Sequence, residues 1–243
     1  MNADRRMRLW GLVAEHTQGG PATVGDVCAV AIRVCGVDRA AVTVMLPANP
    51  HETLWASDRV ASELEELVFT LGEGPCVDAR VGGPVLTADL AAPDCLARWP
   101  VFAPAAVQAG ARAVFALPLQ VGAIRLGVLD LYRAEPGGLD RERLADALVL
   151  ADTVCALLLD EAHRDSSVPD GYWPEQVGGQ HPVVHQATGM VLVQLGVSAA
   201  VALSRLRAYA FAHDRRLSEV AGDVVARRLR FQSDPEPGVE GGG

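Results

Sequence analysis

The chain has 243 residues, a formal net charge of −9 at pH 7 and a hydrophobic fraction of 50%. All 21 basic residues are arginine, which excludes mechanisms that need a lysine, such as the phosphate-binding P-loop and Schiff-base chemistry. The five cysteines include no CxxC pair and the first residues show no apolar signal region, so we expect no disulfide framework and a cytoplasmic location.

The first 135 residues alternate between helical and strand patterns. Helices are predicted at about 4–17, in VGDVCAVAIRVCGVDRA, and at about 59–70 and 103–109. Strands are predicted in AAVTVMLP, ETLWAS, PVLTADL, RAVFALPLQ and IRLGVLDLYR, the last two as an antiparallel hairpin around VGA. This order predicts an α+β fold in which helices flank an antiparallel sheet.

A long connecting helix is predicted over residues 139–164. Apolar side chains recur there at spacings of 4 and 3, the a/d pattern of a heptad seam: Leu144, Leu148, Ala151, Cys155, Leu158 and Ala162. Two interpretations stay open, namely a helix packed on its own sheet and a helix that pairs with a second copy. Leu157 and Leu159 add apolar surface beyond one stripe, which favours a homodimer.

The composition changes after residue 164. Residues 165–180 are rich in Ser, Pro, Gly and acids, as in linkers, and separate a domain at 1–164 from a helical module at 181–232 and a disordered tail at 233–243. The module holds 7 arginines against 3 acidic residues, whereas residues 1–165 hold 14 against 22. A basic module on an acidic body indicates a polyanionic partner.

The module begins with an uncharged run that resembles a membrane span in composition. Gly196 is expected to end a first helix and Ser198 to cap a second, over about 199–213, with a third helix around Leu217 to Val225. Because a membrane span needs about 20 apolar residues, the interrupted run predicts three soluble helices and no membrane partner.

One set of residues, spread over all three helices of the module, carries a family resemblance: Gln186, Ala187 and Gly189, then Ala202, Leu206, Arg207 and Ala210, then Leu217, Val220 and Ala221. With this pattern the module resembles the ANTAR domain, a three-helix RNA-binding module of bacterial antiterminators. The body, through GEGPCVDA, GPVLTADL, RWPVFAPAAVQAGARAVFALPL and LGVLDLY, resembles a GAF domain over about residues 15–160. Proteins with both domains are sensory regulators.

The ANTAR resemblance implies that the module binds tandem stem-loops of a leader transcript and promotes antitermination. The residues expected to contact RNA are Gln186, Ala187, Thr188, Gly189, Arg205, Arg207, Arg215 and Arg216. Gln186 can hydrogen-bond a base edge, Gly189 permits close approach and the arginines can neutralise phosphates. Thr188 departs from the family, in which lysine is common at this position.

Two other functions remain open for the module. In one, it has lost RNA binding and packs against the GAF domain or a partner, so that the chain is a dimeric sensory or interaction protein. The other is DNA binding, which is disfavoured because no helix shows the usual base-reading polar face.

For the GAF part, four residues are candidates to line a small-molecule pocket, with an inert core as the alternative: Cys76, Trp99, Phe102 and Phe115. The sequence requires no cofactor and does not identify a ligand. His181 and His185 lack a third ligand, so no metal site is predicted. No nucleophile–base motif is visible, so no catalytic residue and no enzyme activity are expected.

Overall fold

The computed structural model describes residues 2–17, 19–45, 52–164, 182–213 and 215–232. The chain divides into two compact units, residues 1–180 and 181–243, which we call unit 1 and unit 2. The predicted linker at 165–180 and the predicted tail at 233–243 lie outside the described residues.

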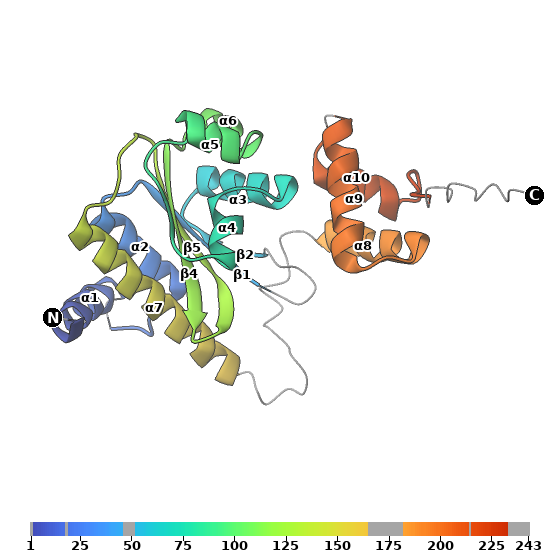
Figure 1. The fold of residues 1–243 in the computed structure, drawn as a ribbon. Coiled ribbons are helices and arrows are strands. Elements are labelled where there is room, and N and C mark those ends of the chain that lie inside the picture. The colour runs from blue at the N-terminus through green and yellow to red at the C-terminus, as the bar shows by residue number, and fades with distance from the viewer. Residues whose placement is uncertain (1, 18, 46–51, 165–181, 214, 233–243) are drawn as a thin grey trace, which may run out of the picture. The chain divides into compact units, whose positions relative to one another are not determined.

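Unit 1 is built on an antiparallel sheet. Its strands are β1 (Arg39–Val44), β2 (Glu52–Ala56), β3 (Val85–Thr87), β4 (Ala113–Val121) and β5 (Ile124–Arg133). They are ordered β2-β1-β5-β4-β3 (Figure 1). The predicted β4–β5 hairpin is present, with Val121 opposite Ile124 at its turn. The α+β fold class is therefore confirmed.

Helices cover both faces of the sheet (Figure 1). One face is covered by α1 (Asn2–His16), α2 (Val24–Cys35) and α7 (Arg141–Arg164). The other face carries α3 (Arg59–Leu71), α4 (Pro75–Val81), α5 (Pro93–Arg98) and α6 (Phe102–Gln108). Side chains alternate between these faces along β5, so Leu129 and Leu131 join the first core while Val128 and Tyr132 join the second.

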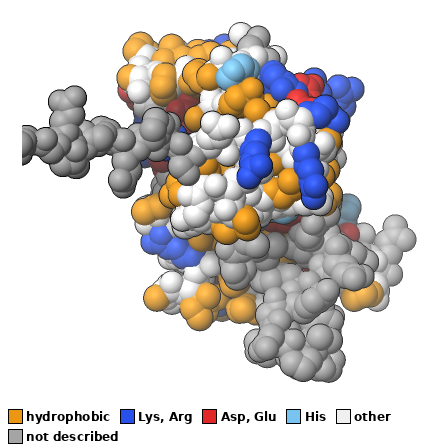
Figure 2. Space-filling model, turned by 90° about the vertical axis from the view of Figure 1, so that its right-hand side faces the viewer, with side chains coloured by type: hydrophobic (Ala, Val, Ile, Leu, Met, Phe, Trp, Pro, Cys, Tyr) orange, Lys and Arg blue, Asp and Glu red, His pale blue; other side chains and the backbone are white. Residues whose placement is uncertain are grey.

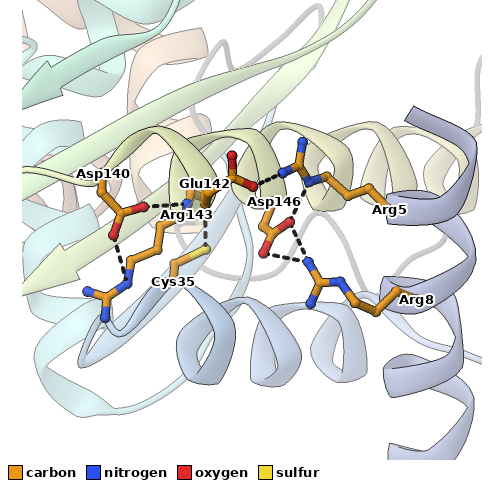
Figure 3. A network of polar contacts seen from close by, with 7 residues as sticks. All are labelled: Arg5, Arg8, Cys35, Asp140, Glu142, Arg143 and Asp146. Carbon is orange, nitrogen blue, oxygen red and sulfur yellow. Dashed lines mark hydrogen bonds and ion pairs between the residues drawn. The ribbon is translucent and has the colours of Figure 1, made fainter. Parts of the chain in front are cut away.

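Polar contacts tie the N-terminal helix α1 to α7 (Figure 3). The carboxylate of Asp146, only 7% exposed, accepts hydrogen bonds or ion pairs from Arg5 Nε at 2.8 Å and Arg8 Nη2 at 2.6 Å. Arg5 also pairs with Glu142. Because one buried acid pairs with two arginines of α1, these contacts fix how α1 packs against α7.

The structure corrects the predicted dimer seam on α7. Ala151, Cys155 and Leu158 are 4%, 3% and 0% exposed and lie in the core that α7 shares with α2 and the sheet. Leu144 packs against the same core, whereas Leu148 is 40% exposed. The side chain of Ala162 lies outside the described part. The heptad pattern is mostly explained by packing within the chain, because a helix that packs on a sheet also buries one apolar stripe of side chains.

Unit 2 is a module of three described helices: α8 (Pro182–Leu195), α9 (Ala199–Ala212) and α10 (Leu217–Val225). As expected, Gly196 follows α8 with a left-handed φ of 66°, and Ser198 caps α9 by accepting from the Val201 amide. No single helix in the described residues is long and apolar enough to span a membrane. Only the pair α8 and α9 reaches that length and composition, and it bends by 106°.

Two short helices, α4 and α5, were not predicted. They span seven and six residues, and each has proline in its first turn. Helices of two turns are too short to show a 3.6-residue periodicity, so the sequence pattern alone does not reveal them.

Candidate functional site

The outer face of α8 carries the first part of the candidate RNA-binding surface. Gln186 and Gly189, three residues apart and therefore on neighbouring positions of one helix face, are both exposed. Nothing within 4 Å would meet a side chain at Gly189, so this face is open. Of the four α8 residues predicted to contact RNA, these are the two that are exposed.

Ala187 and Thr188 do not belong to that face, which corrects their predicted role in RNA contact. Ala187 is 0% and Thr188 7% exposed, and both are buried in α8, which packs against α9 and α10. The Thr188 hydroxyl donates to the Val184 carbonyl at 2.7 Å. Its hydrogen-bonding capacity is therefore used inside the helix.

The four candidate arginines do not form one uniform patch. Arg205 and Arg216 are exposed, whereas Arg207 and Arg215 are half-buried. Arg205 and Arg207 are two residues apart on α9, which places them on different sides of the helix. In Figure 2 some basic side chains stand apart on a surface of apolar and uncharged atoms, whereas others lie beside acidic groups.

Asp223 on α10 pairs with two arginines. Its carboxylate accepts from Arg215 Nη2 at 2.7 Å and from Arg228 Nε at 2.8 Å. The hydrogen bond from Arg215, followed by that from Arg228, lowers the pKa of Asp223 below its ordinary value. The same bond raises the pKa of Arg215. The charge of Arg215 is thus offset within the module, and Arg205 and Arg216 are the exposed members of the four candidate arginines.

Residues that the sequence did not single out hold the segment after α10. Gln194, a polar interruption in the apolar run of α8, accepts from the Phe231 amide at 2.9 Å. The Tyr209 ring meets Phe231 edge-on at 5.6 Å and stacks on His213 at 3.9 Å. These contacts place the arginine-rich segment that follows α10 against α8 and α9.

The predicted pocket residues of unit 1 split between the two faces of the sheet. Cys76, Trp99 and Phe102 share the core beneath α3 to α6, with exposures of 1%, 3% and 0%. Phe115 lies in the core of the opposite face, because alternate β4 side chains point to opposite sides. Phe115 is therefore not part of a common pocket with the other three. Burial raises the pKa of the Cys76 thiol well above its ordinary value, which disfavours a reactive thiolate.

The GEGP stretch before Cys76 has a structural role. The Glu73 carboxylate accepts from the backbone amides of Val101 and Phe102 at 2.8 Å and 2.7 Å, at the start of α6. Gly74 has a φ of 133° and lies against the Phe102 ring, where a Cβ would stand 3.3 Å away. The stretch thus joins the start of α4 to the start of α6.

Two of the buried carboxylic acids in unit 1 were missed as candidate site residues. Glu65 on α3 and Asp130 on β5 are 1% and 0% exposed. Ionisable side chains are almost never fully buried without a compensating partner. The signal available in the sequence was a single acid inside IRLGVLDLYR, a strand otherwise apolar through its second half.

Comparisons with known proteins agree with both resemblances. The GAF domain family matches residues 22–158 and the ANTAR domain family matches residues 179–225. A comparison with curated proteins finds no match.

Among solved structures, the chain is similar to the GAF domain of a phosphoenolpyruvate-protein phosphotransferase from Coxiella burnetii. The two are 15% identical with a TM-score of 0.45, over 69% of this chain and 100% of that one. It is also similar to the corresponding domain from Acinetobacter, with 11% identity and a TM-score of 0.47 over 67% of this chain and 95% of that one. The GAF match covers more than half of the 243 residues. The chain therefore belongs to the GAF domain family and, with an ANTAR domain following its GAF domain, is a regulatory sensory protein.

Proposed function

We propose that the chain is a signal-responsive RNA-binding regulator that promotes transcription antitermination through its ANTAR domain. The observation that carries the proposal is the exposed pair Gln186 and Gly189 on α8, within the residues that match the ANTAR family. A glutamine can read the edge of an unstacked base, and the neighbouring glycine leaves room for that base.

Accessible arginines supply the attraction to RNA. Arg205 and Arg216 are exposed, and each phosphate that an arginine neutralises releases condensed counterions. Binding is therefore expected to weaken steeply with salt. RNA loops suit this surface better than a regular duplex, because their splayed bases can reach an open helix face.

The signal acts by a population shift. In this proposal a homodimer carries two ANTAR domains in the cytoplasm, and the GAF domain changes how often the pair is arranged to hold two stem-loops at once. Two linked modules gain from effective concentration, so a modest change in their arrangement alters affinity strongly. The small-molecule signal is a ligand of the GAF domain.

The test is a titration of the full chain with a two-hairpin leader RNA, followed by fluorescence anisotropy at several salt concentrations. Gln186→Ala is expected to raise Kd about tenfold. Arg205→Ala is expected to reduce the slope of log K against log salt by about 1. Arg59→Ala, which removes an exposed arginine from unit 1, is the matched control and should leave both values unchanged.

A second function competes with this one. Val193 on α8 and Phe211 on α9 are 78% and 67% exposed, so unit 2 presents apolar side chains that a protein partner could cover. In that case unit 2 docks on a protein and does not bind RNA. Absence of salt-dependent binding to any structured RNA, together with protection of residues 182–232 from proteolysis, would support this second function and refute the first.

A further inference from the structure

Three side chains that can ligate metals meet in the core beneath the GAF sheet. They come from separate elements: Glu65 from α3, Cys76 from α4 and Asp130 from β5. A carboxylate oxygen of each acid and the sulfur of Cys76 all lie within 4.8 Å of one another. All three residues are at most 1% exposed, so water does not solvate their charges.

Asp130 is the residue that points to a ligand. Its side chain is fully buried, and in the described part of the chain neither of its oxygens accepts a hydrogen bond from a hydroxyl, an amide or a guanidinium group; the weakly donating thiol of Cys76 is the polar group beside it. A buried carboxylate without a partner costs several kcal/mol unless it is neutralised, so native proteins protonate it or place a cation beside it. A cation that reaches Asp130 also lies within reach of Glu65 and Cys76.

The other two groups are held by neighbouring hydroxyls. The Tyr132 hydroxyl donates to Glu65 Oε1 at 2.5 Å, and Thr43 Oγ1 lies 3.7 Å from Cys76 Sγ. Outer partners of this kind orient metal ligands and are a regular part of metal sites. The cluster is thus a set of positioned donors rather than acids that happen to be adjacent.

The charges of the cluster favour a divalent cation. One added cation would offset the mutual repulsion of all three groups when they are deprotonated. Arg80, whose charge acts on Asp130, carries only half the charge of such an ion.

We propose that Glu65, Cys76 and Asp130 bind one divalent transition-metal ion, of the class of Zn²⁺ or Fe²⁺, inside the GAF domain. A thiolate disfavours Mg²⁺ and Ca²⁺, whereas two carboxylates disfavour the softest ions such as Cu⁺. Three protein ligands leave a coordination position for water or a small molecule. The proposal is independent of RNA binding, because it rests on unit 1 alone.

The experiment uses the full chain. Because the cluster is buried, the protein is unfolded in urea with a reductant and a chelator, then refolded with Co²⁺ as a spectroscopic substitute or with Zn²⁺. The expected result is one metal ion per chain by mass spectrometry, and a thiolate-to-Co²⁺ charge-transfer band in the near ultraviolet. Iron and zinc are also measured in protein purified without refolding.

The variants separate ligation from folding. Cys76→Ser and Asp130→Asn should lose the charge-transfer band and the bound metal, whereas Thr43→Val should weaken the affinity about tenfold. Cys155→Ser, a buried cysteine on the other face of the sheet, is the matched control and should bind as the wild type does. Circular dichroism and the Tm of each variant without metal show whether it has folded.

Two results would overturn the proposal. One is a folded wild-type chain that binds neither Co²⁺ nor Zn²⁺ at micromolar concentration, with a Tm insensitive to metal. The other is a folded Asp130→Asn variant that binds metal as tightly as the wild type. If the wild type binds no metal, Asp130→Asn should also raise the Tm, because removal of a buried ionisable group that no cation neutralises stabilises the folded chain.

Discussion

At the residue scale, burial decides which parts of the ANTAR motif can contact RNA. The four residues from Gln186 to Gly189 are contiguous in the motif, but they lie on different sides of the helix. The first and last are exposed, and the middle two are buried. Thr188, the position that departs from the family, belongs to the inward pair. The departure therefore concerns packing between helices more than charge on the exposed face of α8.

This argument predicts that Thr188→Val leaves RNA affinity within about twofold of the wild type. Valine has nearly the same shape, and the lost hydroxyl served only the Val184 carbonyl. Anisotropy titration of the two-hairpin RNA with Thr188→Val beside Gln186→Ala measures the difference. Equal weakening by both variants would show that Thr188 contacts the RNA after all.

At the scale of elements, the pairing of β1 with β5 depends on one glycine. Gly127 lies opposite Val44, and a Cβ added to it would stand 1.9 Å from the Thr43 carbonyl oxygen. The clash is with the backbone of β1, which cannot move without breaking the backbone hydrogen bonds between β1 and β5. A strand glycine that permits such a close approach has no tolerated substitute.

Gly127→Ala is accordingly expected to lower the free energy of unfolding of the GAF domain by about 3 kcal/mol or more, the upper range for overpacking. Urea denaturation followed by circular dichroism measures the change. Gly83→Ala is the control, because nothing lies within 4 Å of a Cβ at that position. Similar losses in both variants would contradict the steric explanation.

At the scale of the whole molecule, the proposed homodimer needs a surface through which two chains can associate. Most of the predicted seam positions on α7 lie in the core of unit 1, and among the seam positions whose side chains are described Leu148 is the exposed one, at 40%. A dimer formed through α7 therefore needs this outward side of the helix, together with residues outside the original heptad pattern.

Leu148→Glu tests this arrangement. Light scattering after gel filtration should give the wild type about twice the chain mass of 25.6 kDa, and should give the variant the mass of a single chain, because a carboxylate in an apolar contact is unfavourable. Leu96→Glu, a substitution of similar exposure on α5, should remain dimeric. A monomeric wild type, or a dimeric Leu148→Glu, would exclude α7 as the interface.

Local patterns in the sequence determined the element order, the two domain families and the break between α8 and α9. Each of these depends on neighbours in the chain: alternation in β4 and β5, or Gly196 followed by Ser198. Only the tertiary structure decided which side of each element is covered. It separated Phe115 from Cys76, buried Thr188, and brought Glu65, Cys76 and Asp130 within 4.8 Å. The physical reason is that burial depends on partners distant in sequence, which periodicity does not name.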